Sequence, residues 1–312
     1  MKQKILIRCD ASKKIGLGHL SRCLVLAKRF QKEGAKIYFA IRENSLAIQR
    51  LQEEDFEYFL PNTSSYDGWL QHLVDKNSIN IFIGDTRDNL PVNTIKTFQR
   101  KGVLCVALDE PSEYAKECDI CFYPPHAQID KQEYKGKVYQ GFEYVILRDE
   151  FYKEHIKISN KRPNILVMMG GTDAHNLSLN VTQQLLDNSD DIDISLIINQ
   201  NHPDYKILSN LSPKVKCYSN IKNMATFLMQ IDFAIITFGI SAYELVAMKI
   251  PAYHICLDDD HYNASEFFER NGYAKKFKKG DFKLNAINLD IHFTSPIYHN
   301  FITKAILHET RR

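Results

Sequence analysis

Short runs of aliphatic and β-branched residues alternate along the whole chain with polar stretches in which apolar residues recur at helical spacing. Residues 5–7 and 36–41 are apolar runs of strand length, and residues 20–27 place apolar side chains on one face of a helix that Gly34 is positioned to end. This alternation predicts βαβ units, and therefore an α/β fold with parallel sheets. Further strands are predicted at residues 80–84, 103–108, 120–123, 164–169, 194–198, 215–218, 233–237 and 252–257.

The length and one polar segment predict two domains. A chain of 312 residues can form two cores of about 150 residues each. Residues 153–163 are charged, lack a clear period and end in proline, which is typical of a linker. We therefore expect an N-terminal Rossmann-like domain over residues 1–152 and a C-terminal one over residues 164–312, with a last helix near residues 295–308 that can pack back on the N-terminal domain.

Composition narrows the class of protein. Lys plus Arg number 40 and Asp plus Glu 38, so the net charge of +2 argues against a nucleic-acid coat or a polybasic membrane binder. No run approaches the roughly 18 apolar residues of a membrane helix, and the first residues lack the apolar core, about 7–15 residues long, of a signal peptide. The 7 cysteines are scattered, as reduced thiols are. We expect a cytoplasmic protein without an obligate protein partner.

The loop after the first predicted strand has the strongest candidate chemistry. Ligands of open parallel α/β sheets bind beyond the carboxyl ends of the strands. Gly16 and Gly18 let the backbone approach a ligand there, and the start of the next helix favours an anion such as a phosphate. His19 stands where loop and helix meet and is placed for general-base catalysis, although a histidine there can also serve only as a cap or a backbone partner.

Two nucleotide-binding fingerprints fail in this loop. The third glycine of the dinucleotide motif is replaced by Ser21, and the spacing from Asp10 to Gly16 is too long for a dehydrogenase turn. The Gly-Lys-Ser/Thr of a P-loop is absent as well. We expect no cofactor.

Two strand ends in the second half repeat this arrangement. Paired glycines follow the strand at residues 164–169, where they suit a diphosphate, and Thr172 or Asp173 suits the cap of the next helix. Ser241 suits a second helix cap, and Glu244 in the first turn of that helix either binds ribose hydroxyls or only complements the helix dipole.

Charged residues mark the remaining strand ends. Asp85 and Arg87 bring charge to the first half, and Asp109 follows the next strand. Asp260 and His261 fall in an acidic loop, but consecutive Asp side chains diverge and no second His has ligand spacing, which predicts a polar ligand-facing loop without a metal. The candidate ligand-binding residues are Asp10, Gly16, Gly18, Asp85, Arg87, Gly170, Gly171, Thr172, Ser241, Glu244, Asp260 and His261.

Four motifs occur together in this chain. They are Arg8-x-Asp10-Ala-Ser12-x-x-Ile-Gly-x-Gly-His19, Gly141-Phe-x-Tyr144-x-x-Leu-Arg148-x-Glu150-Phe151, Gly170-Gly-Thr-Asp173-x-x-Asn176 and Ser241-x-x-Glu244. In this combination the chain resembles the UDP-sugar hydrolases of the pseudaminic-acid pathway and the related spore-coat polysaccharide proteins.

The resemblance implies a GT-B architecture, in which two Rossmann-like domains face a cleft and the C-terminal half holds the nucleotide. It implies that His19 acts as base on a water that attacks the anomeric carbon of UDP-2,4-diacetamido-2,4,6-trideoxy-β-L-altropyranose, which releases UDP and the free sugar. Ser241 and Glu244 match the nucleotide-binding helix start of related transferases.

Two departures bear on the sugar. The family commonly carries Asp-His-Tyr-Gly where this chain has Asp85-Thr86-Arg87-Asp88, and an Asn-Gln pair stands in some members where this chain has Asp260-His261. Three functions remain open at this point: a nucleotide-sugar hydrolase, a glycosyltransferase in which an acceptor hydroxyl replaces water, and a silent nucleotide-sugar binder.

Overall fold

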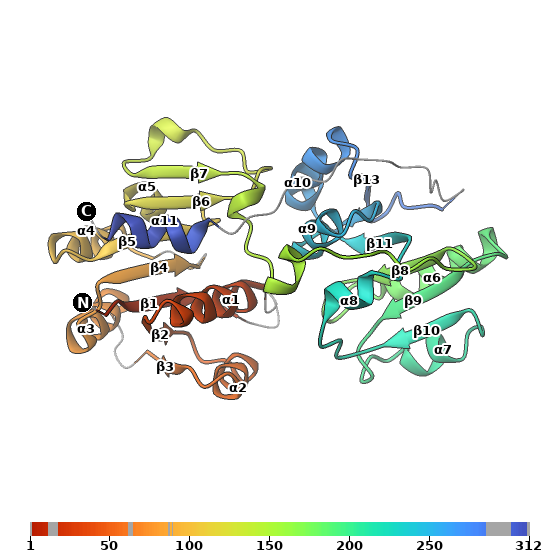
Figure 1. Ribbon diagram of the computed structural model, residues 1–312, viewed down its shortest axis with the longest axis horizontal. Helices are drawn as coiled ribbons and strands as arrows, with labels where there is room; N and C mark the ends of the chain where they lie inside the picture. Colours follow the sequence, from red (N-terminus) through yellow and green to blue (C-terminus); the bar gives the residue numbers. More distant parts are fainter. Residues whose placement is uncertain are drawn as a thin grey trace. The chain divides into compact units, whose positions relative to one another are not determined.

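The computed structural model describes residues 2–11, 18–61, 65–86, 88, 90–284 and 301–310, which fall into two compact units (Figure 1). Unit 1 comprises Met1–Arg148 and His299–Arg312, and unit 2 comprises Asp149–Tyr298. Residues 153–163 lie in unit 2, where Ile158 donates a backbone hydrogen bond to Met229 at 2.8 Å. The chain thus crosses between the units near Arg148 and again near His299.

The sheet of unit 1 is parallel throughout its described strands. Its strand order reverses between β1 and β4, so the loops that leave these two neighbours diverge, as at the ligand-binding edge of Rossmann-like sheets. The order across the sheet is β3 (Glu57–Phe59), β2 (Lys36–Ala40), β1 (Lys4–Cys9), β4 (Ile81–Asp85), β5 (Leu104–Leu108), β6 (Ile120–Tyr123) and β7 (Lys137–Gln140).

Helices cover both faces of this sheet because successive strand residues point to opposite sides. Ile5 and Ile7 pack in one core with α1 (Gly18–Lys32), α2 (Ser45–Glu53) and α11 (Ile302–Glu309), whereas Leu6 packs in the other core. That second core includes α3 (Tyr66–Asn77), α4 (Val92–Arg100) and α5 (Glu113–Glu117). Helix α11, blue in Figure 1, therefore belongs to unit 1 although it comes last in the chain.

Unit 2 repeats the same topology. Its parallel sheet runs β10 (Val215–Tyr218), β9 (Asp193–Ile197), β8 (Asn164–Met168), β11 (Phe233–Thr237), β12 (Ala252–Cys256) and β13 (Ala274–Lys278). The order again reverses, here between β8 and β11. The helices are α6 (Leu177–Asn188), α7 (Tyr205–Ser209), α8 (Met224–Leu228), α9 (Ile240–Ala247) and α10 (Asp259–Arg270).

The structure contains every strand that the apolar runs predict, with ends that agree or differ by at most two residues. Strands β3, β7 and β13 were not predicted: β3 has only three residues, and β7 and β13 are polar strands at sheet edges. The predicted last helix is shorter in the described residues, where α11 begins at Ile302; residues 295–300 lie outside them. Among the helices that the structure describes, none has the length and apolar character to cross a membrane.

Candidate active site

His19 and Asp85 meet at the point where the strand order of unit 1 reverses. His19 is the second residue of α1, which follows β1, and Asp85 is the last residue of the neighbouring strand β4. The His19 Nδ1 lies 2.6 Å from Asp85 Oδ1, and the His19 side chain keeps 19% exposure while that of Asp85 keeps 1%. The imidazole therefore reaches solvent with a buried carboxylate behind it.

Arg22, one turn after His19, holds the same carboxylate with two hydrogen bonds. Its Nε donates to Asp85 Oδ2 at 2.6 Å and its Nη2 to Oδ1 at 2.5 Å, while Nη1 donates to Asp109 Oδ2 at 2.9 Å. Cys23 Sγ donates to Asp85 Oδ2 at 3.3 Å. With His19, these donors occupy the acceptor positions of Asp85, so its carboxylate serves to orient neighbours instead of contacting a ligand.

The charges fix the tautomer of His19. Burial by itself would raise the pKa of Asp85, but the Arg22 guanidinium and the hydrogen bonds from Arg22 and His19 hold that pKa well below its ordinary value. Asp85 is thus an acceptor only, and Nδ1 of His19 must carry the hydrogen between them. In the neutral imidazole, Nε2 is then the lone-pair nitrogen that can take a proton.

The depressed pKa of Asp85 predicts a specific loss of stability in acid. A carboxylate whose pKa is lowered on folding contributes stability above its unfolded pKa, about 3.9, and that contribution is lost as pH falls toward the folded value. We expect the difference in free energy of unfolding between wild type and Asp85→Asn to be constant above about pH 5 and to shrink below about pH 4. Urea unfolding at a series of pH values measures it.

The matched control for this experiment is Asp75→Asn. Asp75 is exposed and pairs with Lys101 at 2.6 Å on the surface, where such pairs contribute little. The free energy of unfolding of each variant is compared with that of wild type at every pH. If the difference for Asp85→Asn varied with pH no more than the difference for Asp75→Asn, the lowered pKa of Asp85 would be contradicted.

Asp10 takes part in a second buried network behind the first. Arg8 is fully buried, donates from Nε to the Tyr66 hydroxyl at 2.7 Å, and pairs with Asp10 at 2.6 Å and with Asp88. Burial alone would lower the pKa of Arg8, but Tyr66, Asp10 and Asp88 raise it above its ordinary value. Thr86 donates to the other oxygen of Asp10 at 2.6 Å. Asp10 therefore neutralises Arg8 and fixes the chain that follows β4.

The paired glycines of unit 2 form an exposed turn between β8 and α6. Gly170 has φ +79°, a left-handed conformation that favours glycine, and Gly170, Gly171 and Thr172 are all exposed. Asp173 is buried and accepts hydrogen bonds from the backbone of Leu177 and of Ser178, both at 2.9 Å. Because Asp173 occupies these amides at the start of α6, the exposed backbone of residues 170–172 is the part that a phosphate can approach.

Removing the Asp173 carboxylate is expected to destabilise the protein. Asp173→Ala leaves two amides at the start of α6 unsatisfied, which lowers the free energy of unfolding by about 1–3 kcal/mol. Asp187→Ala, near the exposed end of the same helix, is the control and should change it by less than about 0.5 kcal/mol. Equal urea midpoints for the two variants would show that Asp173 does not cap α6.

Two expectations for unit 2 are wrong in detail. Helix α9 begins at Ile240, with Gly239 at its cap position, so Ser241 lies inside the helix and Glu244, which is buried, lies beyond the first turn. Asp260 and His261 are not in a loop: α10 begins at Asp259, because Asp258 caps it by accepting from the His261 backbone at 2.8 Å. In both places the helix begins before the residue in question. Helix α9 begins one residue before Ser241, and α10 begins one residue before Asp260.

The structure groups these unit 2 residues at one edge of the sheet. The loops after β8, β11 and β12 leave three adjacent strands, and they carry residues 170–173, the start of α9 and the start of α10. The His261 ring lies 5.8 Å from that of Phe238, which follows β11. In unit 1, Gly18 is the exposed first residue of α1, whereas Gly16 and Arg87 lie outside the described residues.

Arg22 was not predicted as part of the site. Its spacing of three residues from His19 on a helix was the available signal, but only the fold shows that Asp85 and Asp109 reach the same guanidinium. Among the described residues, no group of His, Cys, Asp and Glu is arranged to hold a metal ion.

Comparison with solved structures defines the class of fold. MurG of Acinetobacter baumannii superimposes with a TM-score of 0.75 at 13% sequence identity, covering 99% of each chain, and a glycotransferase of kitacinnamycin superimposes with a TM-score of 0.67 at 14% identity, covering 90% of this chain and 88% of the other. With its two parallel, doubly wound sheets, the chain has the GT-B fold of these transferases.

Sequence comparison identifies particular relatives. The chain is 27% identical over 88% of its length to the UDP-2,4-diacetamido-2,4,6-trideoxy-β-L-altropyranose hydrolase of Campylobacter jejuni, of which it covers 99%. It is 24% identical over 78% of its length to the spore coat polysaccharide biosynthesis protein SpsG of Bacillus subtilis, of which it covers 75%. These matches confirm the resemblance inferred from the motifs.

Other comparisons add less. An uncharacterized protein of Methanocaldococcus jannaschii is 27% identical over 80% of this chain, which spans about half, 54%, of that protein's length. No family model matches the chain.

Proposed function

We propose that the protein is a nucleotide-sugar hydrolase that cleaves UDP-2,4-diacetamido-2,4,6-trideoxy-β-L-altropyranose, or a close relative, to UDP and the free sugar. The observation that carries this proposal is the pair of His19 and Asp85 at the strand-order reversal of unit 1. The similarity over most of the chain to a hydrolase of that substrate supports it. The product would be a free diacetamido sugar of the kind used in nonulosonic (pseudaminic) acid synthesis.

His19 would act as the general base. Its Nε2 takes a proton from a water as the water's oxygen bonds to the anomeric carbon, and the bond from that carbon to the diphosphate oxygen breaks, with the electron pair leaving on UDP. Asp85 positions the ring through Nδ1 and stabilises the imidazolium as it forms, and Arg22 keeps Asp85 ionised and in place. The protein needs no cofactor for this step.

Unit 2 would hold the nucleotide. The exposed turn at Gly170, Gly171 and Thr172 offers backbone groups to the diphosphate. The cap residue of helix α9, Gly239, has no side chain, and the Ala242 amide donates to the Gly239 carbonyl at 3.0 Å, so the amides of Ile240 and Ser241 are the ones that can face the same anion. We assign the nucleotide to the edge of unit 2 formed by residues 170–172, Ser241, Glu244, Asp260 and His261, and the sugar to the edge of unit 1 that includes Asp10 and Gly18. Gly16 and Arg87, which lie outside the described residues, are assigned to the sugar from the sequence alone.

The cysteines fit a cytoplasmic setting. All seven are free thiols in the structure. Burial raises the pKa of Cys23, Cys105 and Cys118 well above the ordinary value, so these thiols remain protonated and unreactive. We infer that the protein works in the reducing cytoplasm.

Release of UDP without an acceptor tests the proposed function. The purified protein is incubated with the UDP-diacetamido sugar in buffer, and UDP and free sugar are quantified by chromatography. Equal amounts of both products support a hydrolase. UDP that appears only when a hydroxyl acceptor is added would mean a glycosyltransferase, and binding of the nucleotide sugar with no release under either condition would mean a silent binder.

A further inference from the structure

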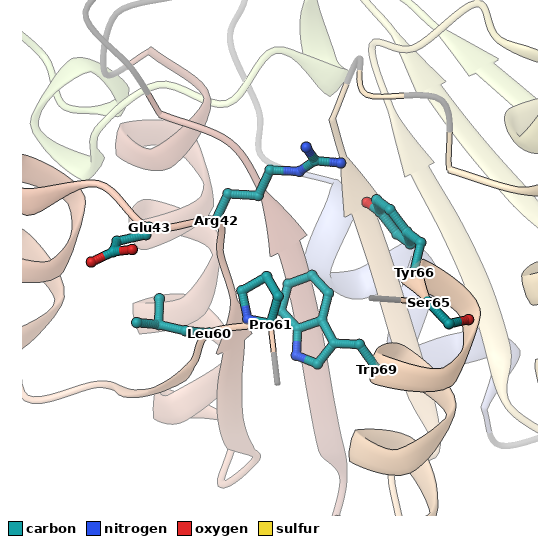
Figure 2. A pocket seen from close by; sticks show the side chains of 7 residues that line it. All are labelled: Arg42, Glu43, Leu60, Pro61, Ser65, Tyr66 and Trp69. Atoms are coloured by element: carbon teal, nitrogen blue, oxygen red, sulfur yellow. The ribbon is translucent and has the colours of Figure 1, made fainter. Parts of the chain in front are cut away.

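Unit 1 has a pocket of about 450 Å³, a size typical of small-molecule sites (Figure 2). It lies where β2 and β3 end and α3 begins, at the carboxyl edge of the sheet that also carries His19 and Asp85. The residues that line it are Arg42, Glu43, Leu60, Pro61, Ser65, Tyr66 and Trp69.

One wall of the pocket is apolar and firmly held. Pro61 lies beside the indole of Trp69 in Figure 2, and Leu60 precedes Pro61 in the chain. The Trp69 ring packs edge-on against Tyr66, with ring centroids 6.0 Å apart, and the buried Arg8 guanidinium lies 5.7 Å from its centre. Trp69 itself keeps only 1% exposure, so the surface that a small apolar group such as a methyl can contact is that of Leu60 and the exposed Pro61.

The charges around the pocket balance. Arg42 donates from Nε to Asp88 at 3.1 Å, and Asp88 also accepts from Arg8 and from Tyr66. Since Asp10 pairs with Arg8, two guanidinium groups face two carboxylates and the cluster has no net charge. The carboxylate of Glu43 points away from Tyr66 and Trp69 in Figure 2. The pocket therefore has no excess charge to attract an ionic ligand, which favours a neutral polar one.

Arg42 nevertheless offers hydrogen-bond donors. Its guanidinium lies 5.5 Å from the centre of the Tyr66 ring, which orients its plane, and its side chain is 56% exposed. Its two Nη groups have no partner among the residues that the structure describes. A carbonyl oxygen can accept from them at little cost, because Nε stays paired with Asp88.

We propose that this pocket binds an acetamido group of the sugar, with its methyl group against Leu60 and Pro61 and its carbonyl oxygen accepting from Arg42. The inference rests on the proposed function for the identity of the sugar. The pocket and the pair of His19 and Asp85 share one edge of the sheet: Arg42, which follows β2, donates to Asp88, which comes three residues after Asp85 at the end of β4.

Trp69 reports directly on the pocket, because it is the single tryptophan of the chain. Its fluorescence is titrated with free 2,4-diacetamido-2,4,6-trideoxyhexose and with the corresponding 2,4-diamino sugar, which lacks both acetyl groups. We expect the emission to change and saturate with the acetylated sugar, and the diamino sugar to bind at least about tenfold more weakly.

Arg42→Met keeps an apolar side chain of similar length but removes the donors, and should weaken binding of the acetylated sugar about tenfold. Arg50→Met is the matched control, since Arg50 is exposed to the same degree, at 53%, and pairs with Glu53 on the surface of α2. The control should bind like wild type.

The outcomes separate this proposal from the proposed function. Emission that does not respond to the acetylated sugar, equal responses to the two sugars, or equal affinity of wild type and Arg42→Met would each overturn the acetamido pocket even if UDP is released. If the acetylated sugar binds more tightly than the diamino sugar and Arg42→Met weakens that binding, but no UDP is released from the UDP-diacetamido sugar, the acetamido pocket is supported and the proposed hydrolase function is contradicted.

Discussion

Replacing His19 by alanine is expected to lower kcat for UDP release by about 10²- to 10⁴-fold, the range for loss of a positioned general base. The imidazole is the exposed end of a hydrogen-bonded pair whose other member, Asp85, is buried. Because the nucleotide is assigned to unit 2, KM should change much less than kcat. Steady-state kinetics of UDP release measure both constants.

His72→Ala is the control for this prediction. His72 is exposed on α3 and makes no hydrogen bond or ion pair with another described residue. Its removal should leave kcat and KM at wild-type values. If kcat of His19→Ala stayed within about twofold of the control, His19 would not be the base.

Asp85→Asn is expected to produce the second-largest loss, of about 10²- to 10⁴-fold in kcat, with the upper end matching the cost of a mis-set tautomer in a serine protease triad. The change removes the negative charge that stabilises the imidazolium and, among the described residues, leaves Asp109 as the carboxylate partner of Arg22. An amide can also turn its NH₂ toward Nδ1, and His19 then carries its hydrogen on Nε2, where it cannot accept a proton.

A positioning role can be distinguished from simple unfolding. Asp85→Asn should keep its affinity for UDP, because unit 2 holds the nucleotide, and its kcat should remain low at temperatures well below its unfolding transition. The surface variant Asp75→Asn should keep wild-type kcat. Loss of UDP affinity in parallel with kcat would indicate a damaged fold instead of a misplaced imidazole.

Most of the fold could be predicted from the sequence, because parallel strands that are buried on both faces consist of consecutive aliphatic residues. Strands such as β4 and β11 lie between layers of helices and are buried along their whole length, so their composition alone marks them. Edge strands are not marked in this way: β13 carries lysines and, among the strands that the structure describes, pairs with β12 alone. The place of α11 in unit 1 depends on the packing of Ile302 and Ile306, which no local pattern reveals.

The sequence predicts site residues only where a side chain capable of catalysis or ligand binding directly follows a predicted strand. The sequence places His19 directly after a glycine-containing loop that follows a strand, and the structure puts it at the start of α1 beside Asp85. The role of Asp85 could not be predicted, because its four donors come from His19, Arg22 and Cys23 on a helix more than 60 residues away in sequence. Ser241 was misplaced because a helix can begin without a capping side chain, and Gly239 gives no such signal.

Turnover in water enriched in oxygen-18 tests the central claim most directly. The protein is incubated with the UDP-diacetamido sugar without an acceptor, and the released UDP is analysed by mass spectrometry. Attack of a His19-activated water on the anomeric carbon predicts that UDP is released without the label, because the oxygen between sugar and phosphorus leaves with UDP. UDP that carries oxygen-18 would show attack at phosphorus, and no release of UDP would show that the protein is not a hydrolase of this substrate; either result contradicts the account.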